Sequence, residues 1–156
     1  MSGKIIGSLI VAIALIAGIS LYYLQVYYYY DEVAADAVDI RLTPVQGGAP
    51  ESIPAVVLGA IDANSSPIRF RACFTTPLSQ AMLTETYRIY DDAEPLTAPG
   101  WFDCFDAGDI GAALEDGRAI AFLGEADIAH GVDRIVAVFD DGRAFAWHQL
   151  NSEFKD

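Results

Sequence analysis

The sequence predicts an α+β protein: one N-terminal transmembrane helix, then a small domain with a mostly antiparallel sheet and about two helices. The first observation is a run of twenty uncharged residues, Ile5 to Leu24, of which eleven are Ile, Leu or Val. The second is a series of alternating segments in the rest of the chain, with two helical patterns inserted midway. Sequential strands with inserted helices are typical of a sheet covered by helices on one face.

The apolar run is long enough to cross a bilayer, because twenty residues at about 1.5 Å each span about 30 Å. A secretory signal is the alternative, but its apolar stretch is usually about 7–15 residues long and precedes a small-x-small cleavage site. Here the run leads into Leu21-Tyr22-Tyr23-Leu24-Gln25 instead. Residues 1–30 are therefore predicted to be a retained anchor in the lipid bilayer.

The flanking charges predict the orientation of this anchor. Lys4 is the only basic residue before the run. Four acidic residues follow the run before the first downstream cation, Arg41: Asp31, Glu32, Asp36 and Asp39. The positive-inside preference places the N-terminus in the cytoplasm and the rest of the chain in the periplasm, or in whichever compartment lies outside.

Six of the eight tyrosines lie at the outer end of the anchor, at Tyr22, Tyr23, Tyr27, Tyr28, Tyr29 and Tyr30. Tyrosine rings prefer the headgroup layer, where an apolar ring and a wet hydroxyl are both satisfied. The set is read as a membrane-interface belt. Alternatively, some of these rings contact a neighbouring membrane subunit or its pigment or quinone, because four consecutive tyrosines point all round a helix.

Small side chains form a stripe along one face of the predicted helix. At about 100° per residue, the stripe comprises Gly3, Gly7, Ala14 and Gly18, and Gln25 continues it at the outer end. Small residues allow helix backbones to approach closely in lipid, so this face is a candidate helix-docking stripe. Gly and Ala are also simply common in membrane helices.

The rest of the chain is predicted to be an acidic stem, residues 31–37, and one α+β domain, residues 38–156. All 22 acidic residues lie beyond the apolar run, against eight Lys and Arg, so this part has a net charge of −14. Such a charge argues against nucleic acid and anionic lipid as partners. A basic periplasmic protein such as a cytochrome c would be complementary, although an acidic surface also serves solubility alone.

The first half of the domain is predicted to contain three strands and one helix. Residues 38–43 and 68–74 alternate apolar with polar side chains, and residues 53–61 form a more apolar strand. In residues 68–74, one face carries Ile68, Phe70, Ala72 and Phe74, and the other carries Arg69, Arg71 and Cys73. Thr76-Pro77 fits the start of a helix over residues 77–89.

The second half is predicted to contain one helix and three strands. Asp106 is a candidate N-cap with Asp109 three residues on, and Gly117 ends the helix. A short buried strand follows at residues 119–123. Residues 134–139 and 143–150 flank Asp140-Asp141-Gly142, a strong hairpin signal.

Cys73 and Cys104 are the only cysteines, and a domain outside the cytoplasm favours a disulfide between them. The alternatives are a Cys2His2 metal site with His130 and His148, which lacks zinc-finger spacing, and a redox dithiol, which lacks the close C-x-x-C arrangement. Neither a metal nor another cofactor is expected.

Arg69 and Arg71 project from one predicted strand face. They are expected to pair with local carboxylates, and contact with an anion or a partner is the minority interpretation. The Asp103, Asp106 and Asp109 set lacks the calcium-loop ladder and is better explained by helix capping. No nucleophile-elbow, zincin, P-loop or dinucleotide motif is present, so no catalytic residues are expected.

The segment Ile61-Asp62-Ala63-Asn64-Ser65-Ser66-Pro67-Ile68-Arg69-Phe70-Arg71-Ala72-Cys73-Phe74-Thr75-Thr76, behind a short N-terminal span, resembles a family of small uncharacterised single-span proteins of alphaproteobacteria. The resemblance implies an inner-membrane location and no established activity.

Two functions follow as hypotheses. The first is a non-enzymatic, single-span accessory or assembly subunit of a larger inner-membrane complex, respiratory or photosynthetic, with an acidic periplasmic interaction domain. The second is a solitary membrane-anchored periplasmic domain that binds a ligand or handles thiols or metal.

Overall fold

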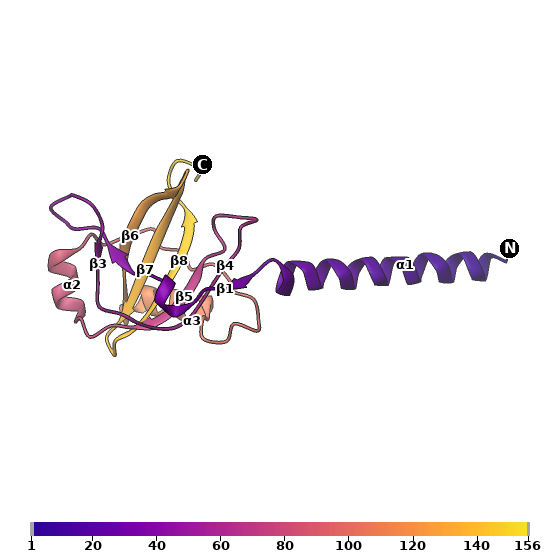
Figure 1. Cartoon of the computed structure of the whole chain (residues 1–156), viewed down its shortest axis with the longest axis horizontal. Helices are drawn as coiled ribbons and strands as arrows, with labels where there is room; N and C mark the ends of the chain where they lie inside the picture. The colour runs from indigo at the N-terminus through magenta and orange to yellow at the C-terminus, as the bar shows by residue number, and fades with distance from the viewer. Residues whose placement is uncertain (1, 156) are drawn as a thin grey trace.

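A long N-terminal helix projects from an α+β domain in the computed structural model, which describes residues 2–155 (Figure 1). Helix α1, Gly3–Tyr23, continues into a π-helical turn, η1, Leu24–Tyr28. No residue of α1 is buried. The helix from Gly3 to Tyr28 has the length and composition of a membrane span, which an N-terminal signal sequence shares.

The domain is built on a six-stranded antiparallel sheet in the order β1-β4-β5-β8-β7-β6. Its strands are β1 Asp31–Glu32, β4 Val56–Asp62, β5 Arg71–Thr75, β6 Ala119–Ala129, β7 Val132–Phe139 and β8 Arg143–Leu150. A two-stranded sheet pairs β2 Arg41–Leu42 with β3 Glu51–Ser52. The helices are the 3-10 turn η2 Ala35–Ala37, α2 Gln80–Thr86 and α3 Ala107–Asp116. The predicted α+β class is confirmed.

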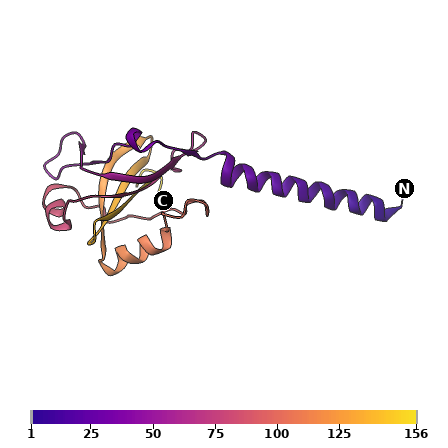
Figure 2. The same cartoon turned by 60° about the horizontal axis from the view of Figure 1, so that its bottom comes forward.

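Both faces of the sheet are buried. Strand β5 shows this, since its alternate side chains enter two separate cores. Ala72 and Phe74 join the core that includes Leu83 of α2. Cys73 joins the other core, which includes Ile110 of α3. Figure 2 shows α3 lying along one side of the sheet. The alternation of faces at Ala72, Cys73 and Phe74 was therefore predicted correctly, whereas the expectation that the helices cover only one face of the sheet was wrong.

The hairpin and the second helix agree with their sequence signals. Strand β8 spans the predicted residues 143–150. Gly142 has a φ of 89° and donates its N–H to the Phe139 carbonyl at 3.2 Å, which closes the turn. Asp106 caps α3 by accepting from the Asp109 N–H at 3.1 Å. The left-handed Gly117 then ends the helix.

The predicted acidic stem is not a free linker. Asp31 and Glu32 pair with the end of β4, and the Val33 N–H donates to the Ala60 carbonyl at 2.9 Å. Val33 and Val38 also pack against the first core. These two apolar side chains and the unpaired edge of β4 are the physical reasons that the segment is held on the sheet.

The predicted bounds of all three strands in the first half were wrong: residues 53–61 form a strand only from Val56, in β4. Within residues 38–43 only β2 is a strand, although Ile40 and Leu42 are buried as the alternation predicts. Strand β5 begins at Arg71 rather than at residue 68. The Arg71 guanidinium donates hydrogen bonds to the carbonyls of Ile68 and Phe70, both at 2.7 Å. The chain before Arg71 therefore does not extend the strand.

The predicted helix over residues 77–89 is shorter than expected. It begins at Gln80, because Ser79 is the N-cap and its Oγ accepts from the Met82 N–H at 3.3 Å. It ends at Thr86, because the following residues extend along the edge of β6. There the Tyr90 N–H donates to the Ala121 carbonyl at 2.9 Å. Strands β6 and β7 are longer than the predicted residues 119–123 and 134–139.

Gly124 allows a close approach between β6 and the chain around β2. A Cβ at this position would lie 2.8 Å from the Arg134 carbonyl and 3.3 Å from the Arg41 carbonyl. We therefore expect Gly124→Ala to destabilise the domain by about 1–3 kcal/mol, because backbone has to shift. The measurement is the urea midpoint of unfolding.

The matched control is Gly111→Ala in α3, where an added Cβ meets nothing within 4 Å. Alanine favours helix over glycine by up to about 1 kcal/mol, so this variant should be as stable as the original or more stable. Equal stability of the two variants would contradict the close approach at Gly124.

Candidate functional site: the junction between helix and domain

Helix α1 ends in a π-helical turn whose last carbonyls are available to the domain. The Tyr29 N–H donates to the Leu24 carbonyl at 3.1 Å, five residues back. Helix ends leave their final carbonyls without intrahelical donors. The Val26 carbonyl finds its donor in the domain: Trp101 Nε1 lies 2.6 Å away. Residues 75 positions apart in sequence are thus joined.

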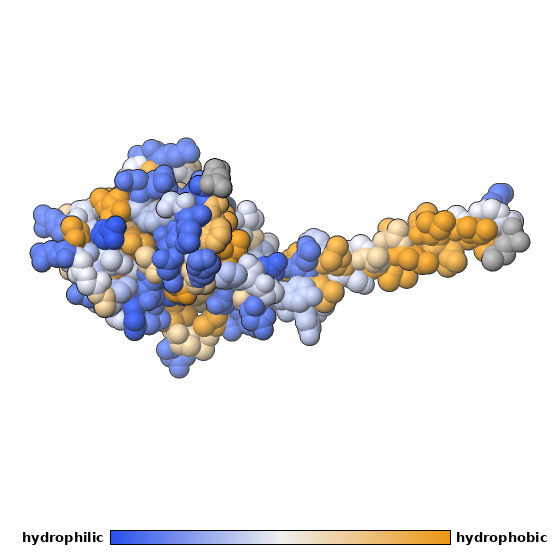
Figure 3. Space-filling view, turned by 90° about the horizontal axis from the view of Figure 1, so that it is seen from above, coloured by the Kyte–Doolittle hydropathy of each residue, from blue (hydrophilic) through white to orange (hydrophobic). Residues whose placement is uncertain are grey.

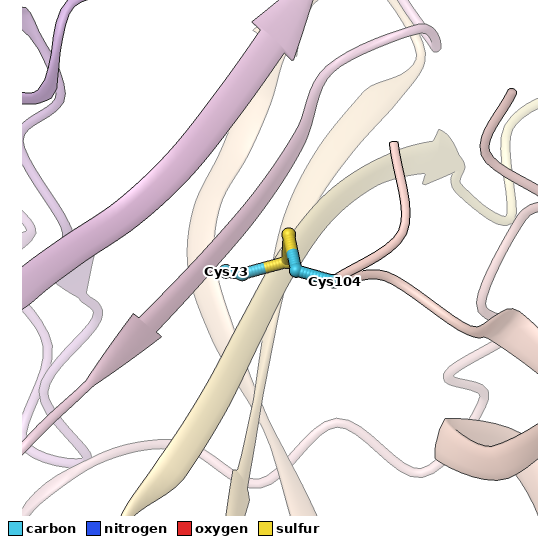
Figure 4. The surroundings of a disulfide bond; sticks show 2 residues. All are labelled: Cys73 and Cys104. Carbon is cyan, nitrogen blue, oxygen red and sulfur yellow. A yellow bond between two sulfur atoms is a disulfide. The ribbon is translucent and has the colours of Figure 1, made fainter. Parts of the chain in front are cut away.

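Trp101 lies in the segment between α2 and α3, and residues 95–105 are named the Trp101 loop here. The loop is fastened to β5 by a disulfide between Cys73 and Cys104, as predicted (Figure 4). Cys73 is only 2% exposed, whereas Cys104 is at the surface. Gly59 of β4 makes room beside the disulfide, since a Cβ there would lie 3.3 Å from the Phe102 ring.

Aromatic rings surround Trp101 and divide the predicted tyrosine belt into two groups. Trp101 is 6.4 Å from Tyr27 and 6.2 Å from Tyr30, measured between ring centroids, and Tyr27 stacks on Tyr23 at 5.8 Å. The remaining three, Tyr22, Tyr28 and Tyr29, are 63%, 65% and 40% exposed. One group therefore contacts the Trp101 cluster and the other does not, although Tyr23 and Tyr27 of the first group are themselves 56% and 46% exposed.

Arg69 contacts Tyr30, just after the helical turn that ends α1. Its guanidinium lies 5.3 Å from the centroid of the Tyr30 ring, within reach of a cation–π interaction. Residues 63–70, which carry it, are named the Arg69 loop. Arg69 forms no ion pair among residues 2–155, so the expected pairing with a carboxylate was wrong.

Arg71 joins the Arg69 loop to the Trp101 loop. It is 3% exposed and donates to the Ile68 and Phe70 carbonyls on one side, and to the Leu96 and Thr97 carbonyls at 2.9 and 3.3 Å on the other. Burial lowers the pKa of its guanidinium to about 10, so it remains a cation at neutral pH. Four carbonyls take the place of the carboxylate predicted for this residue. Arg71 is therefore an internal clamp and not an exposed partner contact.

His148 is buried beneath the Arg69 loop. Its Nε2 accepts from Arg134 Nε at 3.0 Å, and its Nδ1 donates to the Pro67 carbonyl at 2.7 Å. The ring also stacks on Phe70, with centroids 4.8 Å apart. Burial, and next the positive charge of Arg134, lower the pKa of His148 to about 4. The imidazole is therefore neutral at physiological pH.

The structure does not assemble the alternative metal site. His148 is occupied by Arg134 and Pro67, while His130 is exposed and faces Glu153 at 3.8 Å. Both cysteines are in the disulfide. Within the described part of the chain, no group of three or more His, Cys, Asp or Glu side chains has a geometry that would hold a metal ion.

The small-residue stripe on α1 has no partner among residues 2–155. A Cβ built at Gly3, Gly7 or Gly18 meets nothing within 4 Å. Ala14 and Gln25 are also exposed. The domain packs only against the last turn of the helix and leaves the face of the stripe uncovered.

An acidic cleft of about 480 Å³ lies between the start of β7 and the C-terminal segment. Its central carboxylate, Asp133, is 6% exposed and accepts from Tyr90 Oη at 3.2 Å, the Asp127 N–H at 2.9 Å and Asn151 Nδ2 at 3.1 Å. Burial and the Asp133 charge raise the pKa of Tyr90 to about 12. The hydrogen-bonding groups of this cluster are paired with one another, and they stabilise the turn between β6 and β7.

Sequence reasoning missed the two central residues of the junction. The bond between Trp101 and Val26 had no local signal in the sequence. Arg71 was placed on the correct strand face, but its carbonyl partners lie in loops with no regular pattern. The one available hint was that Arg71 shares a predicted strand face with Cys73.

Comparison with known proteins identifies the domain at the level of a family. A family of unknown function, DUF6446, matches residues 40–156. No curated protein and no solved structure matches the chain. The inner-membrane and alphaproteobacterial parts of the resemblance stay predictions. Since the match covers every strand of the main sheet except β1, most of both cores and the Trp101 loop, the chain belongs to the DUF6446 family.

Proposed function

We propose that the chain is a non-enzymatic, single-span accessory or assembly subunit of a larger membrane complex, with its domain on the periplasmic side of a bacterial inner membrane. The observation that carries this proposal is the junction. The helix meets the domain through Trp101, Tyr30 and Arg69 rather than through a free linker. A fixed orientation serves an interaction domain that must face one partner, whereas a tethered enzyme or carrier does not need it.

The uncovered faces supply the two expected contacts. In the membrane, the stripe from Gly3 to Gly18 allows close approach of a helix from an integral membrane protein. Outside it, the acidic surface is complementary to a basic periplasmic protein such as a cytochrome c. A respiratory or photosynthetic complex has both kinds of partner.

Enlarging the stripe should detach the chain from its complex. We expect Gly7→Leu combined with Gly18→Leu to abolish stoichiometric co-purification with a membrane complex, because two isobutyl groups separate the helix backbones. The measurement is purification by a C-terminal tag after mild detergent extraction, followed by mass spectrometry of the partners.

Ala12→Leu is the matched control, since Ala12 lies about 150° from the stripe at 100° per residue. It should leave co-purification unchanged. If the original protein purifies alone, or if the stripe variant keeps its partners, the accessory-subunit proposal is overturned.

A second candidate is a domain that acts alone in thiol chemistry, and the surface position of Cys104 favours it. An incoming thiolate would attack the Cys104 sulfur, form a mixed disulfide with it and release Cys73 as a thiolate, which takes a proton from water. Titration of free thiols in native protein taken directly from cells tests this version. A substantial reduced fraction would favour it over a permanent structural disulfide.

A further inference from the structure

Two loops lie at the end of the domain that faces the anchor helix, as Figure 1 shows. They are the Arg69 loop, residues 63–70, and the Trp101 loop, residues 95–105. Each contacts the end of the helix, through Arg69 over Tyr30 and through Trp101 on Val26. Arg71 binds carbonyls in both loops, so they form one preorganised surface.

The position of Trp101 along the helix axis follows from the Val26 contact. Val26 is two residues beyond Leu24, where the uncharged apolar run ends. At about 1.5 Å per residue, that places it about 3 Å beyond the run, at the depth of the headgroup layer. Trp101 also lies beside Tyr27 and Tyr30 of the predicted belt. Tryptophan is the residue that most often accompanies tyrosine at this depth.

Charge separates these two loops from the rest of the domain, including the acidic pair Asp31 and Glu32 that directly follows the tyrosines. None of the 22 acidic residues lies in the Arg69 loop, and the Trp101 loop has one, Asp103, after eight uncharged residues from Pro95 to Phe102. Figure 3 shows the apolar helix passing through paler residues before the mostly hydrophilic surface of the domain. An acidic surface is repelled by anionic headgroups, so an uncharged segment is the part suited to the membrane.

We propose that residues 95–102 are a second membrane contact, with Trp101 seated in the headgroup layer of the phospholipid beside the helix. The inference rests on the proposed function in one respect, that α1 spans the bilayer. Trp101 thereby completes an aromatic belt that the tyrosines begin. The disulfide at Cys104 and the Arg71 clamp hold the loop in shape before it meets lipid, so little ordering is required on contact.

The test uses the full chain in phosphatidylcholine vesicles, with a nitroxide at Gly100→Cys. Gly100 is exposed, adjoins Trp101, and an added Cβ there meets nothing within 4 Å. We expect this label to be more accessible to molecular oxygen, which concentrates in lipid, than to a water-soluble nickel chelate. The matched control is Met82→Cys on α2, which lies at the end of the domain away from α1 in Figure 1 and should remain fully aqueous.

A second measurement does not depend on an added cysteine. The emission of Trp101 is obtained as the difference between the original protein and Trp101→Phe, whose remaining Trp147 is fully buried in the domain. A nitroxide on the lipid headgroup should quench Trp101 and leave Trp147 unaffected. This readout keeps the proposal testable if the labelled variant is misfolded.

The outcomes separate the two claims. If the protein floats with the vesicles but both the Gly100 label and Trp101 are aqueous, the second contact is overturned and the anchor stands; a protein partner would then be the better occupant of the loop. If the protein does not float with the vesicles, the anchor proposal fails and the second contact fails with it.

Discussion

Replacing Cys73 and Cys104 together by Ala should lower the free energy of unfolding of the domain by about 3.5–4 kcal/mol. The disulfide closes a loop between residues 31 positions apart, and the chain-entropy estimate for a loop of this length gives that value. Small domains have a total stability of about 5–15 kcal/mol, so this is a large share of it. Alanine is chosen because the site of Cys73 is 2% exposed and a serine hydroxyl would be buried there.

Unfolding is followed in detergent by the emission of Trp147, which is fully buried in the second core and packs edge-to-face against Phe105. Asp103→Asn is the matched control: the residue is exposed and adjoins Cys104, and its replacement should change stability by less than about 0.5 kcal/mol. A loss below about 1 kcal/mol in the double variant would show that the disulfide does not constrain the unfolded chain as the estimate assumes.

Acidification from pH 6.5 to pH 4 should lower the free energy of unfolding by about 3 kcal/mol, because the buried His148 resists protonation in the folded protein. The pKa of this residue is about 4 in the folded protein, and an unfolded histidine titrates near 6.5. Between these values the unfolded chain binds a proton that the folded chain excludes, so stability is fully present above pH 6.5 and is lost as the pH falls towards 4. Protonation also removes the acceptor of Arg134 Nε and sets two cations side by side.

Other charged groups around His148 set the size of this effect. Arg134 and Arg71 both lower the pKa of His148, and the 7% exposure of its side chain leaves little solvent to screen them. Asp62, which lies near both arginines, acts in the opposite direction. Its pKa is raised by burial, so its protonation on acidification offsets part of the loss. The carboxylates with lowered pKa, Asp39 and Asp141 among them, contribute only at lower pH.

Two variants test the assignment to His148. His148→Gln should flatten the dependence of the urea midpoint on pH between 6.5 and 4, because the amide does not titrate. His130→Gln should retain the full dependence, since His130 is exposed at the surface. An equal pH dependence in both variants would mean that another group is responsible.

The sequence by itself determined the classes of element and several of their ends. The apolar run, the Asp106 cap with Gly117, and the Asp140-Asp141-Gly142 hairpin all depend on interactions within a few residues of the chain. Periodicity also assigned Ala72, Cys73 and Phe74 to the correct faces of β5. The disulfide followed from having two cysteines in a domain predicted to lie outside the cytoplasm.

Only the tertiary structure decided the junction and the places where elements stop. Trp101 reaches Val26 across 75 residues, Arg71 joins two loops through their carbonyls, and the acidic segment after the anchor is held on the edge of β4. Each depends on which backbone groups remain unpaired after the sheet has formed. Hydrophobic periodicity carries no information about those groups, because a buried carbonyl or a helix end accepts any donor that the fold brings to it.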